Sequence, residues 1–269
     1  MKKSLKYRGI IADVRRVVIK IGSRVIVQKT GRLDARRMRS LIRDLARIQH
    51  NGCELVMVTS GAIAAGMEAL GMKERPTKLQ DLQMAAAVGQ SRLMSRYNDL
   101  FSARDCKVGQ ILLTHADFQH KIRLTNARRT IENLIRNKVI PIINENDVVA
   151  DEEIRADMAL GDNDLLASLV VKLIRADLLI MLTTVNGIRE SGNLGNTRRI
   201  KYLESITKKT FSLVSLNKSN LSTGGMLTKL KAAQIVSKAG CSTIIANGRQ
   251  TGVLTQIMKG EDTGTIVLA

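Results

Sequence analysis

The chain has few aromatic residues, few prolines and few cysteines. Of its 269 residues only three are Tyr and three are Phe, none is Trp, two are Pro and three are Cys. So few aromatic rings leave little surface on which nucleic-acid bases can stack. The scattered Cys53, Cys106 and Cys241 lack metal-ligand spacing and are odd in number, which indicates reduced thiols in a cytoplasmic protein. No apolar run approaches the roughly 18–20 residues that cross a bilayer, so we expect no membrane partner.

Positive charge, by contrast, is abundant. The chain carries 43 Lys and Arg against 24 Asp and Glu, a formal net charge of +19. A surplus of this size favours either a nucleic-acid partner or anionic small substrates. The basic residues are spread along the chain, without a basic tail or a known nucleic-acid-binding motif. We therefore predict anionic small substrates, and keep a basic, non-catalytic nucleic-acid-binding protein as an alternative of a different class.

Short apolar runs alternate with helical patterns along the whole chain. The predicted strands are 15–21, 54–60, 107–114, 139–144, 177–184, 242–247 and 265–269. Most are continuous runs of Val, Ile and Leu, typical of strands buried on both faces. This alternation predicts an α/β fold, in which helices cover both faces of an open, mostly parallel β-sheet. No linker divides the chain, so we expect a single domain over 1–269 with a lobe boundary near residue 175.

Polar residues follow the ends of several predicted strands, where ligands bind in open α/β sheets. They are Lys20, Gly22, Ser23, Thr59, Ser60, Gly61, Asn144, Glu145, Asn146, Asp147, Thr183, Thr184, Asn247 and Gly248. Lys20 can point its ammonium at a phosphate, or it can simply extend to solvent from a strand end. VTSGAIAAG (58–66) is a strand, a Ser-Gly turn and a helix start, which can both seat an anion and allow tight packing.

Two further segments lie just ahead of predicted helices. LSTGGMLTKLKAA (221–233) brings Ser, Thr, two Gly and Lys229 to a helix start, which suits a polyphosphate or an ordinary helix cap. GDND (161–164) fits helix capping or a site in which one Asp orients lysines and Asn163 binds substrate. The three histidines show no catalytic or metal-ligand pairing.

Eight segments in this order resemble the amino acid kinase superfamily and, within it, the glutamate 5-kinase family. They are VVIKIGS, VTSGAIAAGMEALG, AAAVGQSRLM, VGQILLT, INENDVV, GDNDLLASL, STGGMLTKLKAA and GTIVLA, from about residue 16 to 269. The resemblance implies transfer of the γ-phosphoryl group of ATP, with Mg²⁺, to the γ-carboxylate of L-glutamate in the first step of proline biosynthesis. An N-acetylglutamate kinase or a uridylate kinase is the nearest alternative.

The resemblance also implies roles for individual residues. The catalytic residues would be Lys20, Asp164 and Lys229, and the glutamate site would comprise Ser60, Gly61, Asn144, Asp147 and Asn163. The nucleotide site would comprise Lys20, Thr183, Thr184, Thr223, Gly224, Gly225, Met226, Leu227, Thr228 and Lys229. The N-terminal lobe (about 1–175) would bind glutamate and the C-terminal lobe (about 176–269) the nucleotide. No metal ligand is assigned.

Two features depart from the family's pattern. Thr184 stands where the family usually has an Asp, and TTVNGIRESGNLG (183–195) lacks the usual Asp-Pro, which bears on nucleotide contacts. The chain also ends where many bacterial members continue into a PUA domain, so we expect the short form. The resemblance further implies a dimer or tetramer and a glutamyl-phosphate reductase partner. We expect ADEEIRAD (150–157) to be a solvated, mobile loop over the pocket.

Overall fold

The computed structural model describes residues 7–149, 162–191, 197–215 and 223–269. Its central feature is an eight-stranded sheet. In spatial order the strands are β3 (Lys107–Leu113), β4 (Val139–Glu145), β2 (Glu54–Val58), β1 (Arg16–Ile21), β5 (Leu178–Thr183), β9 (Ser242–Asn247), β10 (Thr265–Val267) and β8 (Tyr202–Leu203). A separate antiparallel pair joins β6 (Arg189–Ser191) to β7 (Thr197–Arg199).

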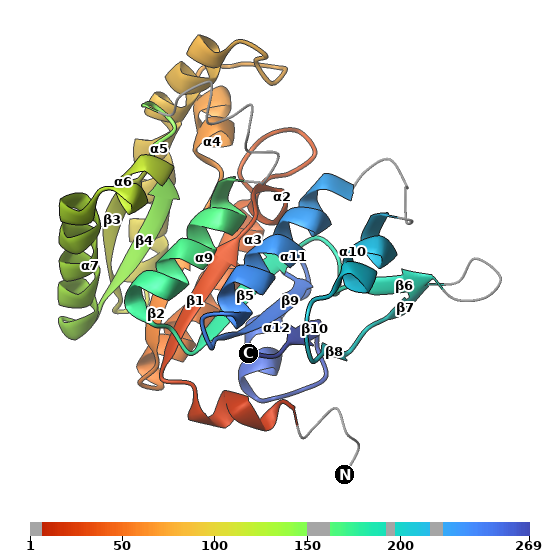
Figure 1. The fold of residues 1–269 in the computed structure, drawn as a ribbon. Coiled ribbons are helices and arrows are strands. Elements are labelled where there is room, and N and C mark those ends of the chain that lie inside the picture. Colours follow the sequence, from red (N-terminus) through yellow and green to blue (C-terminus); the bar gives the residue numbers. More distant parts are fainter. Residues whose placement is uncertain (1–6, 150–161, 192–196, 216–222) are drawn as a thin grey trace.

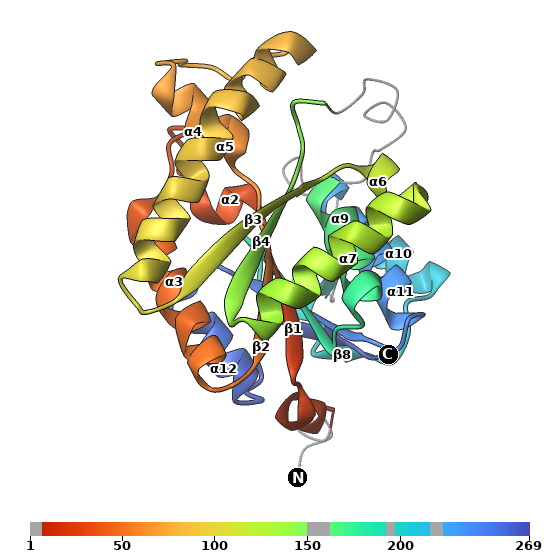
Figure 2. The ribbon, with the colours of Figure 1, turned by 90° about the vertical axis from the view of Figure 1, so that its left-hand side faces the viewer.

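Helices cover both faces of the sheet (Figures 1 and 2). On one face lie α2 (Ser23–Ile26), α3 (Ala35–His50), α4 (Ala62–Ala69), α5 (Leu79–Ser102) and α12 (Val253–Met258). On the other lie α6 (His115–Gln119), α7 (Lys121–Arg136), α9 (Asp162–Ile174), α10 (Lys208–Ser215) and α11 (Thr223–Ser237). A short 3₁₀ helix, η1 (Gly9–Asp13), precedes β1. The predicted αβα sandwich is confirmed.

The sheet is parallel except at one pairing. β1 lies at its centre and pairs in parallel with β2 on one side and β5 on the other. Because β5 follows residue 175, one continuous sheet runs through both halves of the chain. β10 pairs antiparallel with β9 and parallel with β8. The parallel order explains why most strands are continuous apolar runs, since both faces are covered by helices.

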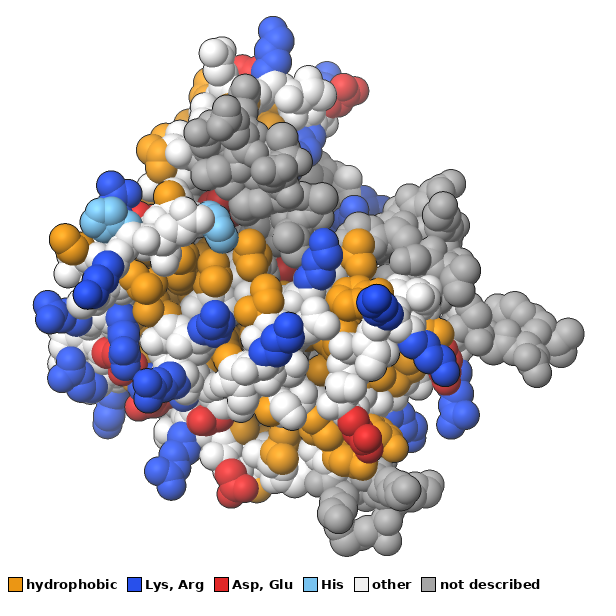
Figure 3. Space-filling model, in the orientation of Figure 1, with side chains coloured by type: hydrophobic (Ala, Val, Ile, Leu, Met, Phe, Trp, Pro, Cys, Tyr) orange, Lys and Arg blue, Asp and Glu red, His pale blue; other side chains and the backbone are white. Residues whose placement is uncertain are grey.

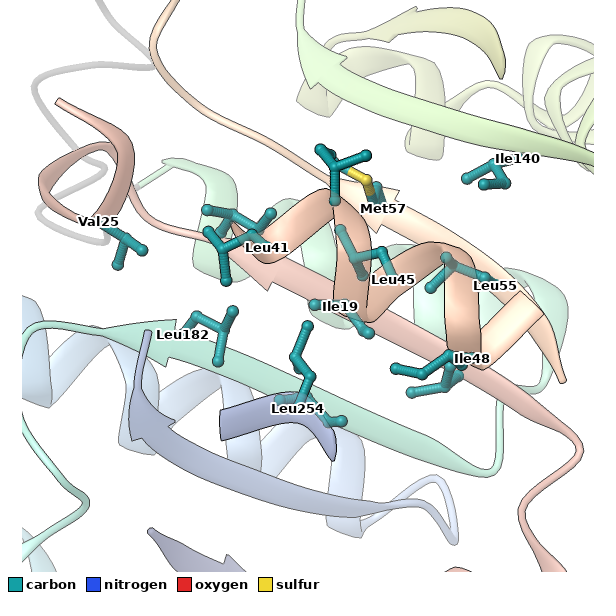
Figure 4. Packing of buried hydrophobic residues seen from close by; sticks show 14 of the residues in the cluster. Ile19, Val25, Leu41, Leu45, Ile48, Leu55, Met57, Ile140, Leu182 and Leu254 are labelled. Carbon is teal, nitrogen blue, oxygen red and sulfur yellow. The ribbon is translucent and has the colours of Figure 1, made fainter. Parts of the chain in front are cut away.

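Alternation along β1 divides the core into two parts. Val17, Ile19 and Ile21 belong to the cluster under α3 and α12, whereas Val18 belongs to the cluster under α9 and α11. Figure 4 shows the first cluster, in which Leu41 and Leu45 of α3 pack over β1. Since successive side chains of a strand point to opposite faces, Lys20 shares the face of Val18. The strand therefore directs its one lysine toward α9 and α11.

All seven predicted strands are present, with ends within two residues of the prediction. The short β6, β7 and β8 were not predicted, because they have only two or three residues each, and β6 and β7 are also polar. The three cysteines are free. No described helix is both long and apolar enough to span a membrane.

Candidate active site

Predicted site residues from distant segments meet at one edge of the sheet. β4, β2, β1, β5 and β9 are parallel neighbours, so their carboxyl ends lie along the same edge. Lys20, near the end of β1, contacts Asp164 in the first turn of α9. Lys229 of α11 contacts the same carboxylate. The edge therefore combines strand ends with two helix starts, as the sequence predicts.

Asp164 is the centre of a buried ionic cluster. Its Oδ1 lies 2.8 Å from Lys20 Nζ, and its Oδ2 lies 2.9 Å from Lys229 Nζ. The Thr228 hydroxyl donates a hydrogen bond of 2.8 Å to Oδ2. The exposed fractions are only 2% for Asp164, 6% for Lys20 and 7% for Lys229. Among the described side chains of this cluster, two ammonium groups and one carboxylate sum to one excess positive charge, and all three are nearly closed to water.

The two lysines control the ionisation of Asp164. Burial by itself would raise the pKa of this carboxyl, but the Lys20 and Lys229 ammonium groups hold it below the ordinary value of 3.8. Asp164 is therefore ionised at neutral pH and orients both lysines. A buried excess charge is unfavourable unless a counter-charge lies nearby, so this cluster is suited to an anionic ligand.

A glycine lets the chain turn tightly beside Lys20. The Gly22 N–H donates to the Leu182 carbonyl at 3.2 Å, which joins the end of β1 to β5. A Cβ added at Gly22 would lie 3.3 Å from that carbonyl oxygen and 3.6 Å from Lys20 Nζ. The contact with the Leu182 carbonyl oxygen is tight, whereas the contact with Lys20 Nζ is an ordinary van der Waals contact, so glycine lets β1 and β5 approach closely here.

The first turns of α11 complete the cluster. The Lys229 ammonium also donates to the Gly225 carbonyl at 3.0 Å, so its side chain folds back toward the helix start. No atom of the described residues would lie within 4 Å of a Cβ added at Gly225. Free N–H groups and the helix dipole favour negative charge at such a helix start. The ammonium and the helix start thus favour an anion in the same place.

Amide side chains lie beside the ionic cluster. Asn163, next to Asp164 in α9, donates from Nδ2 to Ser60 Oγ at 2.9 Å. Asn144, at the end of β4, donates from Nδ2 to Gln90 Oε1 at 2.9 Å. Among the residues that the structure describes, none forms a hydrogen bond with the buried Asn163 Oδ1, Asn144 Oδ1 or Gln90 Nε2. If the oxygen and nitrogen of both the Asn144 and Gln90 amides were exchanged, each amide would still have one buried polar atom outside the hydrogen bond that joins them. These atoms fit a polar ligand, because an unpaired buried polar atom costs about 1–3 kcal/mol.

Gln90 is a candidate site residue that the sequence alone did not identify. It lies on the buried face of α5, between Ala86 and Leu93, and its exposed fraction is 9%. The available signal was a glutamine at an apolar position of a helical repeat. Tyr97, on the same helix as Gln90, forms a second buried polar pair. Its hydroxyl group lies 2.7 Å from that of Thr59, the residue before Ser60. Burial raises the pKa of Tyr97 to about 12, so this phenol stays protonated.

Other predicted residues also lie near this edge of the sheet. Gly61 precedes α4 with φ of 111°, a left-handed conformation that favours glycine. Asp147 lies half-buried in the turn after β4. Thr183 ends β5, and its carbonyl accepts from Gly248 N at 2.8 Å. Thr184, one residue on, is half-buried.

The nucleotide segment is described in part. Met226 and Leu227 are half-buried in α11. Thr223 and Gly224 open this helix, but their side chains lie outside the described part of the chain. The expected loop at 150–157 also lies outside the described residues. Among the residues that the structure describes, no three His, Cys, Asp or Glu side chains form a metal-binding group.

The fold and this site define an enzyme of the amino acid kinase class. The amino acid kinase family model matches residues 15–247. Two solved structures share the fold. A UMP kinase from Bacillus anthracis superposes with a TM-score of 0.60 at 13% identity, covering 95% of this chain and 96% of its own. A carbamate kinase from Giardia lamblia bound to AMP-PNP superposes with a TM-score of 0.62 at 16% identity, covering 96% and 99%.

Sequence relatives narrow the class. A glutamate 5-kinase from Moorella thermoacetica is 42% identical over 260 residues, which is 96% of this chain and 68% of that protein. A glutamate 5-kinase from Syntrophotalea carbinolica is 43% identical over 263 residues, 97% of this chain and 69% of that protein. One from Methylococcus capsulatus is 40% identical over 266 residues, 98% of this chain and 70% of that protein. The chain belongs to the amino acid kinase family, in its glutamate 5-kinase branch.

Proposed function

We propose that this chain is a kinase that transfers the γ-phosphoryl group of ATP to the γ-carboxylate of L-glutamate, giving L-glutamyl 5-phosphate, the first step of proline biosynthesis. The observation that carries the proposal is the buried pair of ammonium groups on Asp164. Both reactants are anions, so the enzyme must above all align them and offset their charge. A preformed site with one excess positive charge does this without reorganisation during the reaction.

Lys20 and Lys229 contact the phosphates in this proposal. In the transition state, negative charge spreads over the oxygens of the transferred group. Two ammonium groups held on opposite oxygens of Asp164 offset that charge from two directions. Asp164 acts as a positioning residue, since both of its oxygens are already engaged with the lysines and Thr228. The start of α11, from Thr223 to Lys229, would hold the phosphates of the nucleotide.

No general base is required. The attacking group is a carboxylate with an ordinary pKa of about 4.3, so it is already ionised at neutral pH. The site accordingly needs no activated histidine. We propose that Ser60, Asn144 and Asn163, with Gly61 and Asp147 beside them, orient glutamate. The unpaired Asn144 Oδ1 and Asn163 Oδ1 are acceptors that suit the three N–H groups of its ammonium.

Mg²⁺ fits this site as part of the nucleotide substrate. Mg²⁺ is commonly held by substrate phosphates, water and one or two carboxylates. We propose that it arrives on the phosphates of ATP, while the lysines contact the remaining phosphate oxygens. Thr183 and Thr184 would border the nucleotide, and the halves before and after residue 175 would bind glutamate and nucleotide respectively. A homo-oligomer, a glutamyl-phosphate reductase partner and a cytoplasmic location stay predictions.

The test is a substrate panel with ATP, Mg²⁺ and hydroxylamine, which traps acyl phosphates as hydroxamates. Glutamate should give hydroxamate, while N-acetylglutamate and aspartate should give little. Phosphorylation of UMP would not form a hydroxamate, so it is measured in a separate assay of ADP release, and UMP should give no release above background. A Lys229→Met preparation serves as the inactive control. Faster turnover of N-acetylglutamate or UMP than of glutamate would reassign the substrate.

A further inference from the structure

A second group of basic side chains lines a hollow of about 710 Å³ away from the ionic cluster. Six of its nine lining residues are arginines, namely Arg36, Arg37, Arg39, Arg43, Arg104 and Arg249. They come from α3, from the residues after α5 and from the turn between β9 and α12. The core of α3 and α12 lies on the opposite face of the sheet from that of α9 and α11. We call this place the arginine hollow.

The positive charge of the arginine hollow is largely unbalanced. Its one acidic lining residue is Asp34, so the lining sums to six positive charges and one negative charge, or +5. The Asp34 side chain caps α3 by accepting from Arg37 N at 2.9 Å. Among the residues that the structure describes, Arg43 is the only one of the six arginines with a carboxylate within 4.0 Å, that of Asp44 at 3.7 Å. Clustered like charges repel one another, so an anion would stabilise this arrangement.

Several of the guanidinium groups are held in place by neutral acceptors. Arg37 donates to the Arg249 carbonyl. Arg249 in turn donates to the Arg24 carbonyl at 2.8 Å, and Arg104 donates to the Leu100 carbonyl at 2.9 Å. Backbone carbonyls orient these side chains without cancelling their charge. The arginine hollow is therefore partly preorganised and still positive.

The chemistry of the lining favours phosphate groups. A guanidinium presents a planar fork of donors that matches a phosphate, and it stays charged at any physiological pH. Arg36, Arg39 and Arg43 follow one another at intervals of about one turn of α3, or about 5.4 Å. Ser40 and Thr251 add hydroxyl groups to the lining. This spacing suits a ligand with several adjacent anionic groups.

The shape and composition favour a small ligand. A volume of about 710 Å³ falls within the roughly 300–1,000 Å³ of small-molecule pockets. No aromatic residue belongs to the lining, so base stacking, the main sequence-independent attraction for single-stranded nucleic acid, is absent there. On the face shown in Figure 3, by contrast, Lys and Arg side chains are spread out over α7, α9 and α11.

We propose that the arginine hollow is a second anion site, which binds a small ligand carrying two or more phosphate groups. None of its lining residues belongs to the ionic cluster around Asp164. The site therefore goes beyond the proposed phosphoryl transfer and does not depend on it.

The test is calorimetric titration of the full chain with inorganic triphosphate at physiological salt. Wild-type protein should bind two equivalents, one at the ionic cluster and one at the arginine hollow. Arg36 and Arg39 are exposed, so the double variant Arg36→Gln/Arg39→Gln should fold normally. It should lose one binding event or weaken it at least about tenfold. The same two events in this variant as in wild type would overturn the proposal.

Two controls separate this site from other effects. Arg128→Gln/Arg129→Gln removes the same charge from exposed positions of α7 and should keep both binding events. An equal loss in this control would overturn the proposal, because general electrostatics would explain it. Lys229→Met should lose only the event at the ionic cluster. If Lys229→Met keeps both binding events while Arg36→Gln/Arg39→Gln (the α3 variant) loses one, the proposed kinase site is refuted and the proposed anion site in the arginine hollow is supported.

The size of the ligand is tested by titrating a short single-stranded RNA into wild type, the α3 variant (Arg36→Gln/Arg39→Gln) and the α7 control (Arg128→Gln/Arg129→Gln). We expect it to bind no more tightly than triphosphate and equally in the α3 variant and the α7 control. RNA binding at least about tenfold tighter than triphosphate, lost only in the α3 variant, would overturn the assignment to a small ligand.

Discussion

Lys20 and Lys229 contact opposite oxygens of one carboxylate, at 2.8 Å from Asp164 Oδ1 and 2.9 Å from Asp164 Oδ2. Lys20 lies in the first third of the chain and Lys229 in the last third, and Asp164 lies between them in sequence, in the first turn of α9. This arrangement fixes two ammonium groups on either side of a buried acid.

Lys229→Met should reduce turnover strongly. Its ammonium would offset charge that develops on the transferred phosphoryl group, and removing one such donor typically costs about 10²–10³ in kcat. Steady-state kinetics with glutamate and ATP measure the effect. Lys231→Met is the matched control, because Lys231 is exposed on the same helix and its loss should leave kcat within about twofold. Near-wild-type turnover in Lys229→Met would refute the assigned role.

Asp164→Asn should destabilise the fold. The change leaves two buried ammonium groups without their shared carboxylate, and breaking a buried ion pair costs about 3–5 kcal/mol. Urea unfolding measures the difference from wild type. Asp99→Asn, an exposed change on α5, is the control and should have little effect. Inorganic triphosphate should raise the melting temperature of Asp164→Asn more than that of wild type, because its charge replaces the missing carboxylate.

The contribution of Asp164 to stability should depend on pH. Its folded-state pKa is lowered below 3.8 by the two lysines, so the ionised carboxylate stabilises the fold above the ordinary pKa. That stabilisation is lost as the pH falls through the lowered folded-state pKa. The difference in unfolding free energy between wild type and Asp164→Asn should therefore shrink below pH 3.8. A difference that stays constant between neutral pH and the acid range would contradict this electrostatic account.

Ser60→Ala and Asn163→Ala should act mainly on glutamate binding. Asn163 Nδ2 donates to Ser60 Oγ at 2.9 Å, beside the unpaired Asn163 Oδ1. Loss of a hydrogen-bonding group is worth about 1–2 kcal/mol, so the KM for glutamate should rise about tenfold. The KM for ATP and kcat should change far less. Ser91→Ala, at an exposed position of α5, provides the control. A fall in kcat at unchanged KM would place these side chains in phosphoryl transfer instead.

The regular parts of the fold were predictable from local patterns. β9 was predicted at 242–247 and has those bounds. α5 (Leu79–Ser102) lies in one of the segments between predicted strands, where the sequence predicts helices. In both elements, the spacing of apolar residues over a few positions of the sequence predicts the secondary structure. β10 was also predicted as a strand, but its antiparallel pairing with β9 depends on the path of the chain after α12, which no local pattern records.

The candidate site also has residues that the sequence predicted and one that it did not. Lys20, Asp164 and Lys229 were predicted from motifs, and the structure brings them into contact. Gln90 was missed, because a glutamine on an apolar helix face has no motif and gains meaning only beside Asn144. The acid-rich stretch from Glu145 to Asp164 is ambiguous in sequence. Only packing shows that Asp164 turns inward onto two lysines, whereas its position within GDND (161–164) also suits an ordinary helix cap.

The sequence by itself determined the strands, the helices and the residue types available at the strand ends. These features follow from side-chain periodicity and backbone preference, which act over a few neighbouring residues. Only the tertiary structure decided which charges meet. Asp164 joins lysines from β1 and α11, and the arginine hollow joins three separate segments. Electrostatic interactions depend on distance in space, and folding sets that distance independently of separation along the chain.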